Sequence, residues 1–242
     1  MAPSCMTGVP PHMIWALLGL GIVLLLALLY WQIIIAEGAY LGPKIVTVLY
    51  DWGAASYDRI KNVDPVDEAI YLAHPLLSRI SDVRSPWILD VATGTGRLPL
   101  AVVQQLDFSG RVVGLDLSAK MLQQARRKLA LFRSRVTLIQ QAAGKLPFRD
   151  GAFDAVTCLE ALEFMPNPPQ VVAEMVRVLR PGGLLLITNR VGWEAHLLQG
   201  RACGRGQMEG VLASLPVRDV RTERWQVYYD LIWARKEERG EP

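Results

Sequence analysis

An apolar strand that runs directly into a glycine-containing turn is the feature that most constrains this chain. Residues 88–97 read Ile-Leu-Asp-Val-Ala-Thr-Gly-Thr-Gly-Arg, and a helical pattern follows them. Because glycine has no Cβ, a turn that contains Gly94 and Gly96 lets backbone N–H groups approach a ligand closely. The next predicted strand, 111–115, leads into Asp116, about twenty residues after Gly96, the spacing expected of an acid that binds ribose hydroxyls. The pattern predicts a site for a nucleotide-like cofactor.

The same turn separates two classes of cofactor. A dinucleotide-binding turn requires a third glycine or alanine where its helix packs on the strand. Here that region carries Pro99, which disfavours a nicotinamide-dependent oxidoreductase. With Asp90 at the end of the first strand and Asp-Leu-Ser at 116–118, the run instead resembles the S-adenosylmethionine site of class I methyltransferases.

A long apolar segment precedes this pattern. Between Met13 and Ala36 there is no charged residue, and Gln32 is the only strongly polar side chain. A helix of this length crosses a hydrocarbon layer of about 30 Å, and aromatic residues such as Trp15 and Trp31 near its ends are typical interfacial anchors. A cleaved secretory signal would have a basic start and a shorter apolar core, and a core helix is seldom apolar on all sides. Residues 13–36 are therefore predicted to be a single transmembrane helix.

Charge predicts the side of the membrane on which the domain lies. No Lys or Arg precedes the apolar segment, whereas Lys44, Arg59 and Lys61 follow it. Since basic residues concentrate on the cytoplasmic side, the globular domain is predicted to be cytoplasmic.

Composition disfavours several other classes of protein. The formal net charge of +3 is modest, and no nucleic-acid-binding module is visible. The three cysteines, Cys5, Cys158 and Cys203, lack the spacing of metal ligands and are odd in number. The sequence thus predicts no metal site, no disulfide framework and no nucleic-acid partner.

Strand and helix patterns alternate from Trp87 onward. The predicted strands are 87–91, 111–115, 136–140, 153–159, 184–188, 217–222 and 225–234. Helices are predicted at 96–106, after the cap Ser118, and from 167 to 179. An earlier helix is predicted to begin at Asp64, with Pro75 as a kink or break. Its residues that face the sheet are predicted to be Ile70, Leu76, Leu77 and Ile80. This order predicts an α/β fold with helices on both faces of a mostly parallel, seven-stranded, Rossmann-like sheet.

Residues 57–234 resemble the ubiquinone and menaquinone branch of class I methyltransferases. Four blocks carry the resemblance, at 89–96, 114–122, 146–154 and 178–183. The resemblance implies S-adenosyl-L-methionine as cofactor, a methyltransferase domain at 64–235 after a connector at 37–63, and a tail at 236–242. The amino-terminal segment, 1–36, holds the transmembrane helix.

The resemblance also implies which residues hold the cofactor. Its methionine part packs on the backbone of the turn, Asp90 orients its ammonium group, and Asp116 binds the ribose hydroxyls. Leu117 and Met121 flank the adenine, while Tyr57 closes over the cofactor. The full set is Tyr57, Asp90, Ala92, Thr93, Gly94, Gly96, Asp116, Leu117, Met121, Gln141 and Ala142.

Two positions depart from the family pattern. An Asp that accepts from the adenine amino group is replaced by Ala142, so Gln141 or Gln140 takes over this contact or it is lost, at a cost of about 1 kcal/mol. A histidine after the fourth strand is replaced by Phe164, so a base is absent there.

Methyl transfer from a sulfonium needs a general base only for some acceptors, because positioning and desolvation supply much of the catalysis. Glu163 and His196 are the candidate catalytic residues by location. The anchor and the apolar Phe164 and Met165 predict a methyltransferase acting on a lipophilic small molecule such as a quinone precursor or a lipid. The alternative is a membrane-tethered scaffold that keeps the fold without the activity.

Overall fold

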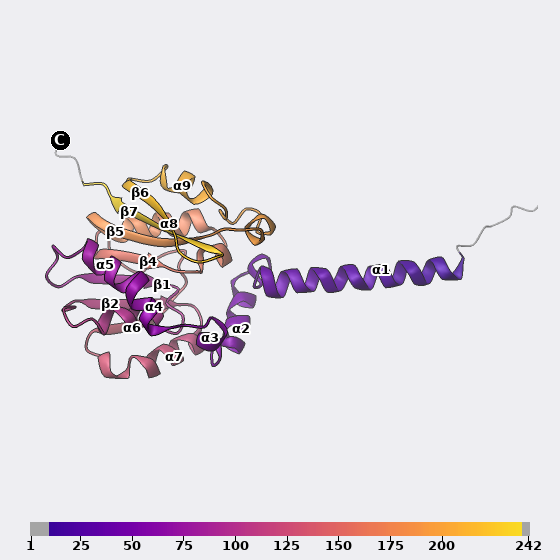
Figure 1. Cartoon of the computed structure of the whole chain (residues 1–242), viewed down its shortest axis with the longest axis horizontal. Helices are drawn as coiled ribbons and strands as arrows, with labels where there is room; N and C mark the ends of the chain where they lie inside the picture. The colour runs from indigo at the N-terminus through magenta and orange to yellow at the C-terminus, as the bar shows by residue number, and fades with distance from the viewer. Residues whose placement is uncertain (1–9, 239–242) are drawn as a thin grey trace, which may run out of the picture.

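A long helix projects from a rounded α/β domain (Figure 1). The structure is a computed structural model that describes residues 10–238; residues 1–9 and 239–242, and with them most of the predicted tail, lie outside the described residues. The long helix is α1 (Pro11–Tyr30), and a π-helical turn, η1 (Trp31–Ile35), continues it to the domain. By length and composition the stretch His12–Ile35 could cross a membrane, and the most apolar part of it makes no buried contact with the domain.

The domain is organised around a seven-stranded sheet, as the sequence predicted. The strands are β1 (Trp87–Val91), β2 (Arg111–Asp116), β3 (Val136–Gln140), β4 (Phe153–Cys158), β5 (Leu179–Arg190), β6 (Val217–Arg224) and β7 (Tyr229–Lys236). Their order is β3-β2-β1-β4-β5-β7-β6; β7 runs antiparallel to both β5 and β6, and the other neighbouring strands pair in parallel. The chain order reverses between β1 and β4, and in open α/β sheets a ligand binds beyond the carboxyl ends of the strands at such a point.

Helices cover both faces of this sheet. One face packs against α8 (Pro168–Val178) and α9 (Gln207–Leu212). The other packs against η3 (Ala69–Ala73), α5 (His74–Arg79), α6 (Arg97–Val103) and α7 (Ala119–Lys128). The remaining short helical elements are η2 (Ala39–Leu41), α2 (Pro43–Gly53), α3 (Tyr57–Ile60), α4 (Pro65–Glu68), η4 (Ala130–Phe132), η5 (Leu162–Phe164) and η6 (Glu194–Leu197).

Side-chain caps fix the starts of three helices. Asp64, Ser118 and Asn167 each accept a hydrogen bond from a backbone N–H in the first turn of the helix that follows. Such caps satisfy donors that the first turn leaves unpaired. The predicted helix starts at these residues are confirmed.

The predicted inward face of the helix that starts at Asp64 is wrong at Ile70, which is half exposed. Residues 69–73 form a wide π-helical turn just before Pro75, a residue that has no N–H to donate. The wide turn shifts the helical phase, so Leu72 joins Leu76 in the core. Pro75 is accommodated by this turn and the helical run continues through it.

Two strands also begin elsewhere than predicted. β5 begins at Leu179 instead of Leu184, so it includes the Pro-Gly-Gly segment and a register shift against β4. β7 begins at Tyr229 instead of Trp225, because Gln226 N donates to Tyr229 O (2.9 Å) and closes the turn between β6 and β7.

The predicted connector at 37–63 is folded against the domain. Tyr40 Oη donates to Gln199 O (2.8 Å), and Arg201 Nη2 donates to Ala39 O (2.6 Å). Helix α2 packs on α7. The connector therefore contributes structure beside the carboxyl ends of the strands.

Candidate functional site

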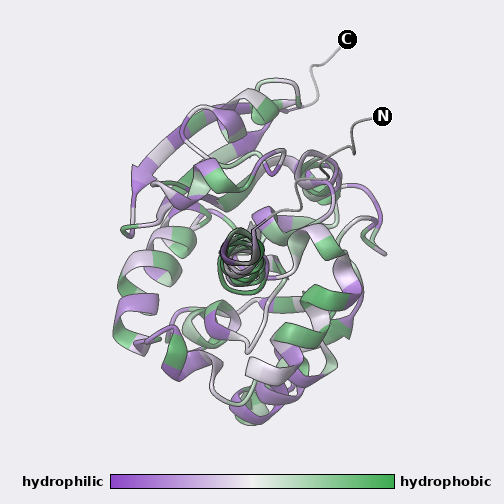
Figure 2. Ribbon diagram, turned by 90° about the vertical axis from the view of Figure 1, so that its right-hand side faces the viewer, coloured by the Kyte–Doolittle hydropathy of each residue, from purple (hydrophilic) through white to green (hydrophobic). Residues whose placement is uncertain are grey.

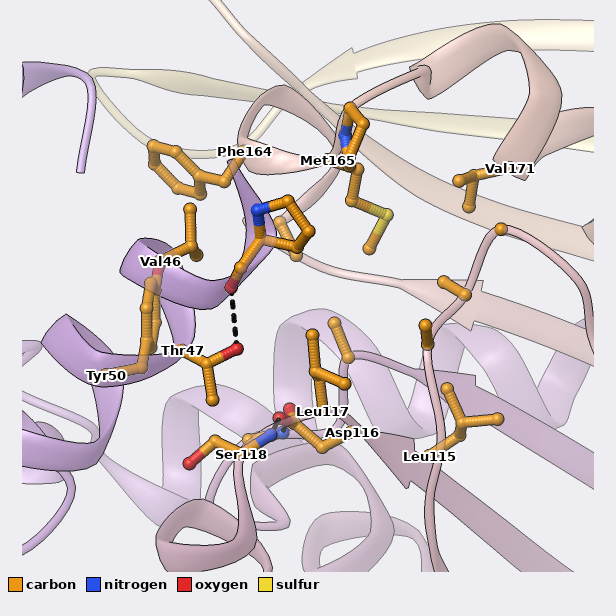
Figure 3. A pocket seen from close by; sticks show the side chains of 18 of the residues that line it. Val46, Thr47, Tyr50, Leu115, Asp116, Leu117, Ser118, Phe164, Met165 and Val171 are labelled. Carbon is orange, nitrogen blue, oxygen red and sulfur yellow. Dashed lines mark hydrogen bonds between the residues drawn. The ribbon is translucent and has the colours of Figure 1, made fainter. Parts of the chain in front are cut away.

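A cavity lies at the carboxyl ends of β1, β2 and β4 (Figure 3). Its walls come from α2, from the turn after β1, from the end of β2, from the loop after β3, and from the segment between β4 and α8. Several residues predicted to hold the cofactor line this cavity: Tyr57, Ala92, Gly94, Asp116, Leu117, Gln141 and Ala142. Others lie behind its wall: Asp90, Thr93, Gly96 and Met121.

Asp116 ends β2 with its carboxylate at the cavity. Its Oδ2 accepts from Gly94 N and its Oδ1 accepts from Ser118 N, both at 2.8 Å. An ionised carboxylate has about four acceptor positions, so further lone pairs are available for hydroxyl groups. Burial raises the pKa of Asp116 above its usual value. The end of β2 thus supplies a fixed acceptor that suits a pair of ribose hydroxyls.

The turn after β1 leaves room for a ligand at one glycine and none at the other. Gly94 has φ +53°, and a Cβ added to it would meet no heavy atom within 4 Å. Gly96 has φ +78°, and its added Cβ would lie 3.0 Å from Leu129 Cδ1 and 3.2 Å from Ala125 Cβ. Gly94 therefore opens the cavity, whereas Gly96 allows α6 to start close against α7.

Asp90 lies behind the cavity wall and is 3% exposed. Its Oδ2 accepts from Thr93 Oγ1 (2.6 Å), and its Oδ1 accepts from Thr157 Oγ1 (2.7 Å). Burial outweighs these hydrogen bonds and raises the pKa of Asp90 to about 6. Asp90 therefore holds the turn from behind and does not line the cavity. Its contact with the ammonium group of the cofactor stays a prediction.

Met121 and Thr93 also face away from the cavity. Met121 is 1% exposed and packs in the core, and Thr93 N donates to Leu115 O (2.9 Å). Leu117, by contrast, lies on the cavity wall and remains partly exposed. Of the two residues predicted to flank the adenine, Leu117 is placed to do so.

Glu160 is a cavity carboxylate that the sequence analysis did not single out. Its Oε1 accepts from Arg97 Nη1 (3.1 Å) and its Oε2 accepts from Lys61 Nζ (3.2 Å). Burial opposes ionisation, yet the two cations lower the pKa of Glu160, so the group stays charged. Arg97 also pairs with Glu68 (2.6 Å). Because Glu68, Arg97 and Glu160 are far apart in the sequence, no local motif predicts that they meet.

Helix α3 closes one side of the turn. Asp58 Oδ1 accepts from Thr95 Oγ1 (2.5 Å), and Asp58 Oδ2 accepts from Lys128 Nζ (2.5 Å). The neighbouring Tyr57 lines the cavity, and burial raises the pKa of its phenol. The Tyr-Asp pair thus holds α3 over the turn and keeps a neutral hydroxyl at the cavity.

The other half of the cavity is mostly apolar. Figure 3 shows Val46, Thr47 and Tyr50 of α2 on one side, with Phe164 beside Val46 and Met165 farther across the cavity. The Tyr50 and Phe164 ring centroids are 6.3 Å apart. The cavity therefore joins a polar end at Asp116 to an apolar, aromatic end.

Tyr50 is oriented by a carboxylate from the segment that follows the long helix. Tyr50 Oη donates to Glu37 Oε2 (2.6 Å), and burial raises the pKa of Tyr50 well above its usual value. The phenol stays neutral. Helix α2 was missed as a site element, although Gly42-Pro43 followed by apolar residues at Ile45 and Leu49 is a helix-start pattern.

Neither predicted catalytic residue faces the cavity. Glu163 is 2% exposed, accepts from Tyr229 Oη (2.5 Å) and lies 4.0 Å from Arg190. His196 lies in a separate surface hollow beyond β5, where its Nδ1 is 3.2 Å from Gly192 O. The placement at the cavity is wrong for both: η5 turns the Glu163 side chain inward, and β5 carries the chain past the cavity before His196.

Comparison with known proteins agrees with this geometry. A family described as a methyltransferase domain matches residues 89–187. The demethylmenaquinone methyltransferase of Lactiplantibacillus plantarum is 34% identical over 140 residues, which are 57% of this chain and 59% of the relative. That of Lactobacillus johnsonii is 32% identical over 164 residues, 63% of this chain and 67% of the relative.

Solved structures share the fold at lower identity. Magnesium protoporphyrin IX methyltransferase from Synechocystis, with S-adenosylmethionine bound, aligns with a TM-score of 0.54 and 16% identity over 71% of this chain and 81% of that chain. The [4+2]-cyclase SpnF aligns with a TM-score of 0.57 and 23% identity over 69% of this chain and 80% of that chain. Since a cyclase has the same fold, the fold alone does not define the reaction.

The strand order and the acid at the end of β2 define a Rossmann-like protein with a nucleotide-type cofactor site. The chain belongs to the S-adenosylmethionine-dependent class I methyltransferases. It spans about three fifths to two thirds of the length of the two curated relatives named above.

Proposed function

We propose that this protein is a membrane-anchored methyltransferase that transfers the methyl group of S-adenosylmethionine to a lipophilic, quinone-type small molecule. The observation that carries the proposal is the continuity of the cavity. One end has Gly94 and Asp116, and the other end is formed by α2, which follows the long apolar helix after a short turn.

The residues at the polar end fit the cofactor. Asp116 has free acceptor positions for ribose hydroxyls, and Gly94 leaves open space where any other residue would place a Cβ. Leu117 and Ala142 offer apolar contact to the adenine. Glu160 is the wall carboxylate that faces the ammonium group in this proposal, in the role first predicted for Asp90.

The bound cofactor supplies an electrophilic methyl group on a sulfonium. The protein orients the two reactants and excludes water from the cavity. Among the described residues that line the cavity, the carboxylates are Asp116 and Glu160, and both already accept hydrogen bonds from the protein. Tyr50 and Tyr57 stay neutral. The walls therefore favour an electron-rich acceptor that is oriented by apolar contact and needs no dedicated base.

The anchor supports an acceptor that resides in the membrane. The two relatives described above are named for demethylmenaquinone, and the apolar half of the cavity would accept the ring of such a molecule. The basic residues that follow the span favour a cytoplasmic position for the domain, where the cofactor is made.

Calorimetric titration of the full-length protein with S-adenosylmethionine, beside an Asp116→Ala variant, tests the cofactor site. We expect micromolar binding that the variant loses. An assay with a demethylated menaquinone in detergent micelles then tests the acceptor. Absence of cofactor binding to a folded protein would favour the inactive scaffold instead. Tight binding of a reduced nicotinamide dinucleotide would point to an oxidoreductase.

A further inference from the structure

Helix α2 carries apolar residues on two opposite faces. Val46 and Tyr50 line the cavity. On the opposite side Ile45, Val48 and Trp52 are 40%, 43% and 76% exposed. A surface helix normally has one apolar stripe, and a helix that is apolar on both sides needs a second apolar neighbour. Gly38 lies close to the Ile45 side chain, yet Ile45, Val48 and Trp52 all remain exposed.

We propose that the outer face of α2 is a membrane-contact surface that lies in the interfacial layer of the bilayer beside α1, so that the acceptor reaches the cavity directly from the lipid. The proposal rests on the membrane insertion of α1 and on the lipophilic acceptor proposed above. It adds the orientation of the domain and the route of the acceptor.

The π-helical turn η1, which continues α1, is bonded to the domain. Trp31 Nε1 donates to Leu197 O (3.3 Å), and Arg190 Nη1 donates to Ile35 O (3.4 Å). Ala36 is fully buried in the same cluster. These hydrogen bonds and the buried Ala36 fix the orientation of the domain relative to the helix.

The length of the apolar helix places the domain against the membrane. The 24 residues of His12–Ile35 extend roughly 36 Å at 1.5 Å per residue, and the hydrocarbon layer is about 30 Å thick. Only about one helical turn is left to separate the domain from the hydrocarbon. Figure 1 shows α2 at the root of α1, and Figure 2 looks along α1 onto the face from which it emerges.

The composition of this face fits the lipid interface. Trp52 is an aromatic side chain of the kind that anchors proteins at the headgroup level, and the exposed Lys44 on α2 can reach lipid phosphates. A second element packed on the end of α1, η6 and the residue before it, exposes Trp193 (61%) and Leu197 (37%). Exposed tryptophans thus lie on two elements near the carboxyl end of the long helix: α2, which is bonded to Glu37, and the η6 segment, which packs on Trp31.

The rim of the cavity includes the same region. Pro43, the first residue of α2, and Pro166, which follows Met165, both line the cavity and are exposed. Leu41 lies just before α2 and is 58% exposed. An apolar molecule in the bilayer could therefore pass from the outer surface of α2 over Pro43 into the cavity without crossing bulk water.

Nitroxide labels on the full-length protein in phosphatidylcholine–phosphatidylglycerol vesicles test the surface. Labels at Val48→Cys and Trp52→Cys, in a Cys5→Ser background, are compared with Leu106→Cys and Leu131→Cys, two exposed leucines on other parts of the domain. The two cysteines of the domain, Cys158 and Cys203, are buried. We expect the α2 labels to collide more with oxygen, which dissolves in lipid, than with a water-soluble nickel complex, and the leucine controls to do the reverse.

The outcomes separate this proposal from the proposed function. If the α2 labels meet the nickel complex as freely as the control labels while S-adenosylmethionine still binds, the membrane surface is overturned and the proposed function stands. If they are shielded but the cofactor does not bind, the surface stands and the proposed function fails. Shielding that disappears when the protein is diluted in lipid would mean contact between copies of the chain, and would also overturn the proposal.

Kinetics give a second readout of the route. Val48→Glu should raise the KM several-fold for an acceptor dissolved in vesicles, while the KM in detergent micelles and the Kd for the cofactor stay unchanged, because Val48 does not line the cavity. An equal rise in vesicles and micelles would contradict entry from the lipid.

Discussion

The two halves of the cavity differ in how the chain builds them. The cofactor half comes from one turn and one acid at the ends of adjacent strands, Gly94 and Asp116, joined by a single hydrogen bond. The acceptor half comes from α2 and η5, which are distant in the sequence and meet only in the folded protein. The cofactor end is therefore built by local structure at the ends of two strands, whereas the acceptor end is built by tertiary packing.

The largest effect is expected at the cofactor half. Asp116→Ala removes the acceptor for two hydroxyl groups, and hydrogen bonds to a charged group contribute about 1.5 kcal/mol or more each. We expect the Kd for S-adenosylmethionine to rise about 100-fold or more. Calorimetry measures it, with Asp107→Ala, an exposed aspartate remote from the cavity, as the control. An unchanged Kd in Asp116→Ala would contradict the placement of the cofactor at this end of the cavity.

The buried acid behind the turn gives a pH-dependent effect. Burial raises the pKa of Asp90 from 3.8 to about 6, so between these values the folded state binds a proton that the unfolded state has lost. Stability from this group is present below pH 4 and is lost as the pH rises through 6, by on the order of 3 kcal/mol.

Asp90→Asn should remove this dependence, because the amide does not titrate. Urea unfolding of the full-length protein in detergent at several pH values measures the slope for both proteins. Parallel slopes between pH 4 and 6 would show that Asp90 titrates normally and would rule out the buried position described above.

The two glycines of the turn offer a matched pair with a smaller effect. Alanine at either position bears left-handed strain of about 1–2 kcal/mol. Beyond that shared cost, Gly96→Ala should lower the unfolding temperature, because its Cβ meets Leu129 and Ala125. Gly94→Ala should instead weaken cofactor binding, because its Cβ enters open cavity space. A larger binding loss in Gly96→Ala than in Gly94→Ala would reverse their roles.

The smallest effect is expected at the acceptor half. Val46→Ala removes apolar contact worth about 1 kcal/mol, so the KM for the acceptor should rise roughly 3- to 10-fold, with no change in the Kd for the cofactor. Val48→Ala, on the opposite face of α2, is the control when the acceptor is supplied in micelles. If Val46→Ala changed the Kd for the cofactor and left the KM for the acceptor unchanged, the cofactor would have to be assigned to the α2 end of the cavity.

Much of the fold could be predicted from sequence because its signals are local. Each parallel strand is a short apolar run bounded by turn residues, and Ser118 and Asn167 mark helix starts by their own hydrogen bonds. Ile70 was misplaced because periodicity assumes a regular helix, and the π-helical turn before Pro75 changes the phase.

The site was predictable to the extent that its residues belong to the motif. Gly94 and Asp116 line the cavity, whereas Asp90 turns its carboxylate to two threonines behind the wall. The role of Glu160 depends on Arg97 and Lys61, and that of α2 depends on where the chain returns after the long helix. Such contacts between distant segments leave no spacing that a sequence pattern can report.

Transfer of a labelled methyl group is the most direct test of the central claim. Full-length protein in vesicles that contain a membrane lipid extract is incubated with S-adenosylmethionine labelled on the methyl carbon, and the organic and aqueous phases are separated. We expect the label to enter the organic phase with wild type and to stay in the aqueous phase with Asp116→Ala. Label that moves only to water-soluble molecules, or to the organic phase equally with both proteins, would contradict a membrane-anchored methyltransferase with a lipophilic acceptor.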